Sequence, residues 1–116
     1  MTSPWSGLLE GVTRVPGVRG AMVVSADDGL VVAESSMSDV DSAAVAALAG
    51  SLMSRLTRAV GALGHEPPRV VHLEAELGAI LAAPAAGGLL LAAVADAQVN
   101  VGLLRLALRE AAARVT

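Results

Sequence analysis

The chain has 116 residues, the length of one domain, and a formal net charge of −3. Its basic side chains are all arginines and form no cluster, which argues against a nucleic-acid interface, because phosphate binding requires a basic face. The absence of cysteine excludes disulfides, thiol nucleophiles and thiolate metal sites, and is compatible with a cytoplasmic location.

The apolar content raises the question of a membrane segment. The first residues show no basic leader before an apolar core, so we expect no signal peptide. Residues 77–95 carry no charge and approach the ~20 residues of a membrane-spanning helix. Pro84, Gly87 and Gly88 lie at the centre of this stretch, where they would break a helix but suit a turn. We therefore expect two strands here and no membrane insertion.

The N-terminal part predicts a helix followed by a β-hairpin. The helix is expected from Pro4 to about Arg14, before a Val-Pro-Gly-Val turn. Residues 19–25 and 30–34 are rich in β-formers and flank Asp28-Gly29, a strong hairpin signal. Both faces of the first strand are apolar, so we expect it to be covered on both sides.

Residues 41–63 form the longest predicted helix. Asp39 or Asp41 can cap its first turn, and Gly64 is expected to end it in the left-handed conformation. Large apolar residues fall in one wide arc of the helix. They are Val45, Leu48, Ala49, Leu52, Met53, Leu56, Ala59, Val60 and Leu63.

Small residues occupy the adjoining face of this helix. They are Ala43, Ala47, Gly50, Ser54, Thr57 and Gly61. Only a narrow polar strip with Arg55 and Arg58 remains for water. We therefore predict two contacts: the large arc against the chain's own sheet, and the small stripe against an identical helix across a two-fold axis.

Three more strands and a last helix are predicted in the C-terminal half. Residues 69–75 alternate, with His72 on a wetter side, as in an edge strand. After a turn at residues 77–78, strands are expected at residues 79–83 and 89–95, and the last is apolar on both faces and hence central. The final helix is expected at residues 99–115.

The predicted order is helix, two strands, helix, three strands, helix. Within this order the sequence contains the runs VPGVRGA (residues 15–21), MVVSADDGLVVA (residues 22–33) and GLLRLALR (residues 102–109). With these runs, nearly the whole chain resembles the roadblock, or dynein light chain, family, especially its bacterial members. The resemblance implies an α+β fold in which a five-stranded antiparallel sheet carries the central helix on one face and the terminal helices on the other.

The resemblance also implies partners. Family members are typically homodimers or heterodimers in which the central helices pack together and the third strands join edge to edge. Bacterial members partner or regulate small Ras-like GTPases. Carried over, the dimer contact comprises Ala43, Ala46, Ala47, Gly50, Met53, Ser54, Thr57, Val70, Val71, His72 and Leu73.

The residues of enzymatic chemistry are largely missing. Only His65 and His72 are available as the histidine of a Ser-His-acid triad, and no Gly-x-Ser-x-Gly turn exposes a serine, so we expect neither a catalytic triad nor an enzyme. The aspartates are explained by turn and capping chemistry, so no metal or cofactor is expected. The sequence has no Gly-rich phosphate loop that follows a strand and opens a helix, so we do not expect the chain to bind GTP itself.

Two alternatives to GTPase regulation remain open. One is a purely structural dimer inside a signalling or cytoskeletal assembly. The other is a small-ligand sensory domain on a profilin-like sheet, although the Ala- and Leu-rich composition offers little of the polar and aromatic lining that such pockets need. Arg55 and Arg58 are candidate partner contacts, and their bland interpretation is a solvated strip on the helix.

Overall fold

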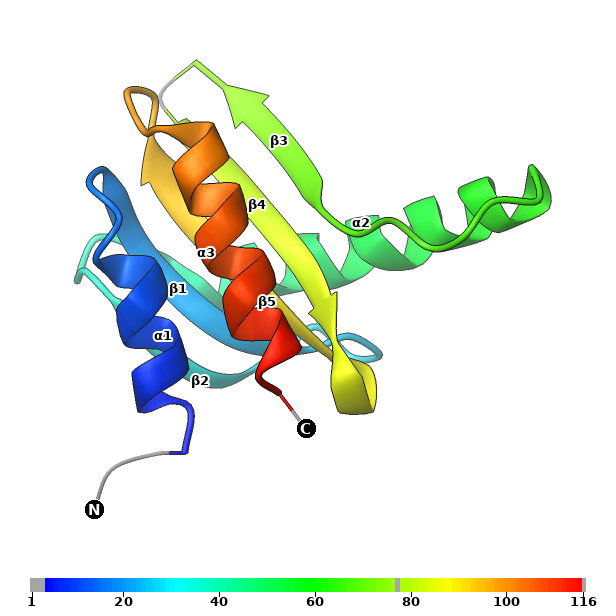
Figure 1. Cartoon of the computed structure of the whole chain (residues 1–116), viewed down its shortest axis with the longest axis horizontal. Helices are drawn as coiled ribbons and strands as arrows, with labels where there is room; N and C mark the ends of the chain where they lie inside the picture. The colour runs from blue at the N-terminus through cyan, green and yellow to red at the C-terminus, as the bar shows by residue number, and fades with distance from the viewer. Residues whose placement is uncertain (1–3, 77, 116) are drawn as a thin grey trace.

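Five antiparallel strands form one sheet in the order β2-β1-β5-β4-β3 (Figure 1). The computed structural model describes residues 4–76 and 78–115. The strands are β1 (Val18–Ser25), β2 (Leu30–Ser36), β3 (Val71–Ala75), β4 (Gly78–Ala85) and β5 (Leu89–Asp96), with the 3-10 turn η1 (Ala86–Gly88) between the last two. The helices are α1 (Ser6–Thr13), α2 (Ser42–Ala62) and α3 (Val101–Ala113).

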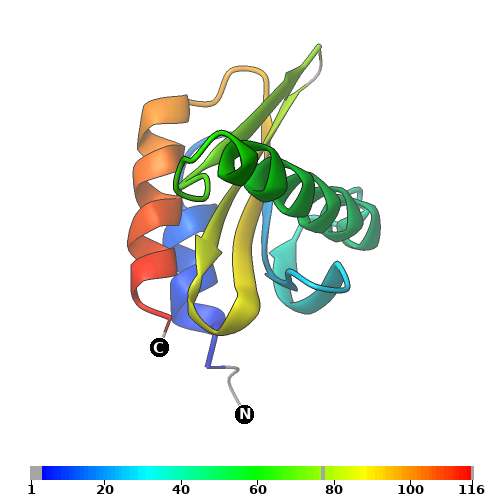
Figure 2. The same cartoon turned by 90° about the vertical axis from the view of Figure 1, so that its right-hand side faces the viewer.

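The sheet lies between two helical layers, with α1 and α3 on one face and α2 on the other (Figure 2). The larger core packs leucines and valines of α1 and α3 against residues such as Val23 and Leu91. The smaller core packs Ala46, Ala49 and Met53 of α2 against the opposite face of the sheet. The predicted α+β fold and the placement of its helices are confirmed.

The centre of the sheet is buried on both sides, as predicted. In β1, Met22 faces α2 and Val23 faces α1 and α3, and both side chains are fully buried. β5 lies in the middle of the sheet between β1 and β4. Because such strands must be apolar on both faces, the run of apolar residues in β5 identified it correctly as central.

The ends of the helices follow from capping. Asp41 accepts a hydrogen bond from the Ala44 amide at 3.1 Å, as predicted. Gly64 follows α2 with a φ of +81°, the left-handed conformation expected of it. Asn100 caps α3 by accepting from the Leu103 amide at 3.0 Å, a cap that we had not predicted.

Several strand boundaries differ from the prediction by one or two residues, for example β2, which ends at Ser36, and β3, which begins at Val71. Pro84, expected in a turn, lies inside β4 and is paired with Leu90 of β5. On its other side β4 has no partner at this point, because the β3 ladder begins with Val71 opposite Ala82. A proline lacks the N–H of a ladder hydrogen bond and is therefore tolerated where one neighbouring strand is missing. Leu77, in the predicted turn before β4, lies outside the described residues.

Candidate partner-binding surface

Helix α2 crosses the sheet and continues beyond it. It packs over β2, β1, β5 and β4, and its second half projects past β3 (Figure 1). The last buried residue of α2 is Met53. Residues 54–62, about 13 Å of helix, therefore have no sheet of their own chain beneath them.

The projecting half exposes apolar side chains. Leu56 is 37 % exposed, and Leu63, directly after the helix, is 74 % exposed. Leu48, in the half of α2 that lies over the sheet, is also 39 % exposed. Burying apolar surface is favourable, so a row of leucines on a projecting helix indicates a surface that a partner covers.

This placement corrects the predicted division of the α2 faces. The prediction places the whole arc of large residues against the chain's own sheet. In the structure only the part with Ala49 and Met53 packs there, and Leu48, Leu56 and Leu63 are exposed. The predicted arc is wider than contact with the sheet alone requires. This width indicates that one part of the arc packs on the sheet and another part is left for a partner.

The small stripe is corrected as well. The Cα of Gly29, in the turn between β1 and β2, lies 3.1 Å from the place where a Cβ on Gly50 would stand. In turn, the Cα of Ala47 lies 3.1 Å from where a Cβ on Gly29 would stand. The glycines let the hairpin turn and the helix of the same chain touch, so at Gly50 the stripe serves packing within the chain, whereas the side chain of Ala47 stays exposed.

The remaining predicted contact residues divide by exposure. Ala46, Gly50 and Met53 are buried in their own domain, so a partner reaches them only if that packing changes. The others are exposed or half-buried, namely Ala43, Ala47, Ser54, Thr57, Val70, Val71, His72 and Leu73. Their contact with a partner stays a prediction, to which the structure adds Leu48, Leu56 and Leu63.

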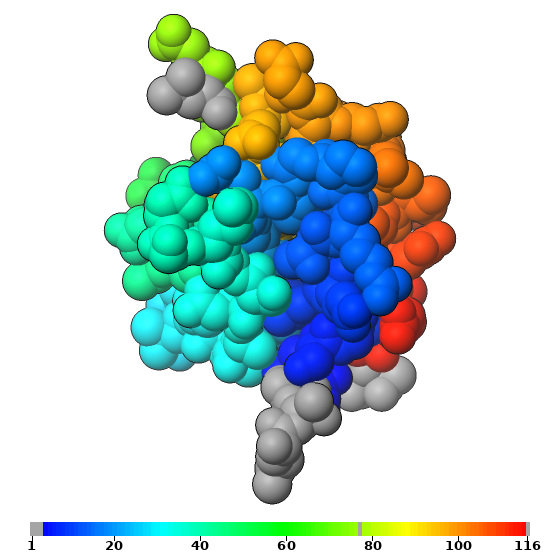
Figure 3. Space-filling view, turned by 90° about the vertical axis from the view of Figure 1, so that its left-hand side faces the viewer, coloured from blue at the N-terminus to red at the C-terminus, as the bar shows by residue number. Residues whose placement is uncertain are grey.

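The two edges of the sheet differ in their suitability for pairing. Val23 and Val24 of β1 pair with Ala33 and Val31 of β2, so Val32 is an extra, bulged residue in β2. Bulges of this kind disfavour the addition of another strand. The space-filling view toward this side shows α1 in dark blue next to the cyan segment that contains β2 (Figure 3). β2 is therefore the protected edge.

The β3 edge is regular. Its five residues pair with β4 without a shift in register, from Val71 opposite Ala82 to Ala75 opposite Gly78. Leu73 at its centre is 40 % exposed. A flat, regular edge with an exposed leucine is a template for another strand, and it is the edge past which α2 projects.

Polar contacts hold the loop before α2. Arg19 of β1 pairs with Asp39 in this loop and with Asp96 at the end of β5, the latter at 3.4 Å. The hydrogen bond and charge of Asp39, with a smaller contribution from Asp96, raise the pKa of Arg19 above its ordinary value. Ser42, the buried first residue of α2, hydrogen-bonds to Glu34. These contacts set the point from which α2 starts across the sheet.

Arg55 and Arg58 lie together on one wall of a shallow groove of about 370 Å³ between α2 and the β1–β2 turn. Asp27 and Asp28 line the opposite wall. Among the described residues neither arginine has an ion-pair partner. Both side chains are exposed and available to a partner that binds along α2.

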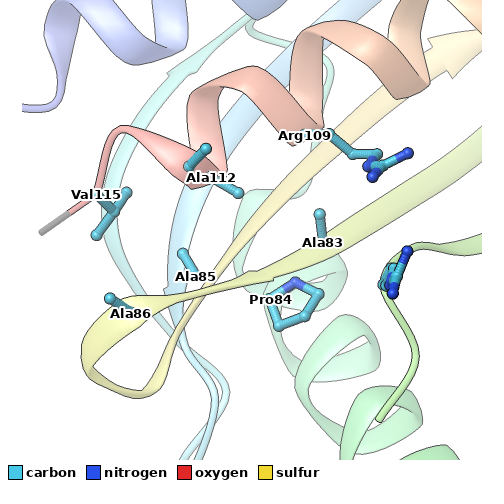
Figure 4. A pocket seen from close by; sticks show the side chains of 9 residues that line it. Ala83, Pro84, Ala85, Ala86, Arg109, Ala112 and Val115 are labelled. Carbon is cyan, nitrogen blue, oxygen red and sulfur yellow. The ribbon is translucent and has the colours of Figure 1, made fainter. Parts of the chain in front are cut away.

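A second groove, of about 420 Å³, lies between the end of β4 and the end of α3 (Figure 4). Its floor is formed by small residues such as Ala83, Ala85 and Ala112, and Arg69 and Arg109 stand at its rim. No aromatic residue lines it. The groove lacks the mixed polar and aromatic lining of a sensory pocket.

The two histidines lie on different segments of the chain. His65 follows the end of α2 and His72 lies in β3, and both are exposed. Within residues 4–76 and 78–115, no three His, Asp or Glu side chains are grouped so as to hold a metal ion. No described helix has the length and apolarity to cross a bilayer.

Comparison with known proteins identifies the family. The model of the Roadblock/LC7 domain matches residues 7–95. An uncharacterized protein of Methanocaldococcus jannaschii is 35% identical over 108 residues, which cover 93% of this chain and 89% of that protein. Among solved structures, a Roadblock/LC7 domain from Streptomyces avermitilis is 27% identical with a TM-score of 0.78, covering 91% of this chain and 89% of that one.

MglB of Myxococcus xanthus shares the fold at 13% identity, with a TM-score of 0.80 and coverage of 95% of this chain and 92% of that one. The family model spans most of the chain, from α1 to the end of β5. Its match agrees with the observed sheet and its two helical layers. The chain therefore belongs to the Roadblock/LC7 family.

Proposed function

We propose that this chain is a non-enzymatic, dimeric adaptor that regulates a small Ras-like GTPase. The observation that carries the proposal is the projection of α2 past the regular β3 edge with Leu56 and Leu63 exposed. A second copy beside β3 would continue the sheet and place another helical layer under the projecting half of α2.

The dimer is supported by the difference between the edges. β2 is bulged at Val32 and flanked by α1, whereas β3 is regular and open. A homodimer with a two-fold axis uses the same patch on both copies. Leu56 and Leu63, on and directly after the projecting half of α2, and Leu73 of β3 are exposed and supply such a patch.

The GTPase as partner is supported by family membership, because the resemblance implies Ras-like GTPases as the partners of bacterial roadblock proteins. Arg55 and Arg58 add a basic strip on the exposed side of α2. The absence of enzymatic activity is proposed because two exposed histidines on separate elements offer no activated nucleophile.

The test uses Ras-like GTPases encoded by genes next to the one for this chain. We expect one of them to co-purify with the chain and to change its rate of GTP hydrolysis or of nucleotide exchange when the chain is added. Arg55→Glu combined with Arg58→Glu should abolish this effect without changing the dimeric mass. Arg105→Glu combined with Arg109→Glu, on α3 in the opposite layer, is the matched control and should keep the effect.

If no neighbouring GTPase binds or changes its rate, the regulatory proposal is wrong. A dimeric mass in that experiment would favour the alternative of a purely structural dimer.

A further inference from the structure

We infer that the two-fold axis of the dimer passes at Leu73, so that His72 of each copy lies opposite Glu74 of the other. The inference rests on the dimer of the proposed function and deepens it by fixing which residues meet. It is carried by the geometry, length and charge pattern of β3.

Symmetry limits the ways in which two β3 strands can pair. Residues directly opposite each other in an antiparallel pair point to the same face of the sheet. A two-fold axis perpendicular to the sheet keeps each side chain on its face, so opposite residues must be an even number of positions apart along the strand. One residue of β3 must therefore lie opposite its own copy.

The length of β3 favours its central residue for that role. β3 has five residues, Val71–Ala75. All five find a partner inside the second β3 only if Leu73 lies on the axis. An axis at either neighbouring residue leaves one end of each strand opposite the loop or turn that flanks β3.

The charges favour the same register. An axis at Glu74 would place two carboxylates directly opposite each other, which is destabilising. An axis at Leu73 instead places His72 opposite Glu74 on both sides of the axis, with Cβ atoms about 4.5–5.5 Å apart. An imidazole N–H can donate to a carboxylate oxygen at this separation.

The faces of β3 agree with this arrangement. Val71 packs with the core under α2, whereas His72 is paired with Leu81, a residue of the core under α1 and α3. Side chains alternate along a strand, so Leu73 points to the α2 face. Two copies of Leu73 would therefore meet on the face that carries the exposed leucines of both α2 helices, and the two His72–Glu74 pairs would lie on the other face.

Single cysteines test the register, because the chain contains no other cysteine. Directly opposite residues have Cα atoms about 4.5–5.5 Å apart, within the range of a disulfide, while residues displaced by two positions are too far apart. We expect Leu73→Cys alone to form a disulfide-linked dimer under mild oxidation. Val71→Cys and Ala75→Cys should not crosslink alone but should crosslink when the two are mixed.

The outcomes separate the register from the dimer. Each reduced variant is first weighed by light scattering, and monomeric masses at high concentration for all variants and for wild type would overturn the dimer itself. If the variants are dimeric, and Val71→Cys crosslinks with Leu73→Cys while Leu73→Cys alone does not, the axis lies at His72 and the inference is wrong. If the variants are dimeric and none of them crosslinks, the β3 strands do not pair and the inference is also wrong.

Charge reversal supplies a second measurement. His72→Glu should weaken the dimer by roughly tenfold in dissociation constant, because it places like charges opposite each other twice. His72→Glu combined with Glu74→His should restore the affinity by reversing each pair. Failure of the double variant to recover, with both variants folded by circular dichroism, would contradict the pairing of these two positions.

Discussion

Gly29 and Gly50 meet where the hairpin turn between β1 and β2 lies against α2. Gly29 has a φ of +67°, which a residue with a side chain adopts only with strain. The backbone of Gly29 lies 3.1 Å from the place of a Cβ on Gly50. Side chains at this contact would push α2 away from the hairpin. The direction in which the helix projects would then change as well.

Two glycines of α2 give a matched pair of predictions. Gly50→Ala should lower the free energy of unfolding by about 1–3 kcal/mol, because its methyl group would stand 3.1 Å from the Cα of Gly29 and the hairpin backbone must shift to admit it. Gly61→Ala, at a position with no atom within 4 Å of the added Cβ, should raise it by up to about 1 kcal/mol through helix propensity. Urea unfolding of both variants checks this, and equal effects would contradict the Gly29–Gly50 contact.

The elements themselves were largely predictable because their signals are local. Asp28-Gly29 predicted the hairpin, and the unbroken apolar run of residues 89–95 predicted the central strand. The cap of α2 was predicted at Asp39 or Asp41, and Asp41 forms it. The prediction placed Pro84 in a turn, and this was wrong. A proline is tolerated at this point of β4 because β3 begins opposite Ala82 and leaves Pro84 without a partner on that side. The residues around Pro84 do not reveal where a strand from another part of the sequence will pair with β4.

The candidate site was less predictable than the fold. The need for two contacts on residues 41–63 followed from the shortage of polar positions. Which residues contact the sheet and which contact a partner could not be predicted, because this depends on where the sheet ends beneath the helix. Leu56 and Met53 are equally apolar in sequence, yet only Met53 lies over the sheet.

The cap of α3 supports a prediction at the scale of one helix. Asn100→Ala should lower the free energy of unfolding by about 1 kcal/mol, because the Leu103 amide loses its side-chain acceptor. Asn100→Asp should keep most of the stability, since a carboxylate also accepts at a helix N-terminus. Thermal unfolding of the two variants measures the difference, and an Asn100→Ala variant as stable as wild type would show that the cap contributes nothing.

At the scale of the whole molecule, the sheet has one closed edge and one open edge. The bulge in β2 and the neighbouring α1 protect one side, while β3 and the projecting half of α2 present the other. Exposed apolar side chains also occur on β2 and α3, such as Leu30 and Leu106, but only on the β3 side do they accompany a regular strand edge and a projecting helix. Assembly, rather than a pocket, is the feature toward which the structure of this chain points.

The most direct test of this account is the molar mass in solution, measured by light scattering on wild type, Leu56→Glu and Leu106→Glu. Wild type should have twice the chain mass of 11.5 kDa. Leu56→Glu should shift the mass toward one chain, because a carboxylate would be buried between the α2 helices. Leu106, 55 % exposed on α3 in the opposite layer, is the control, and its variant should remain dimeric. A monomeric wild type, or a Leu56→Glu variant as dimeric as the control, would contradict the proposed dimer.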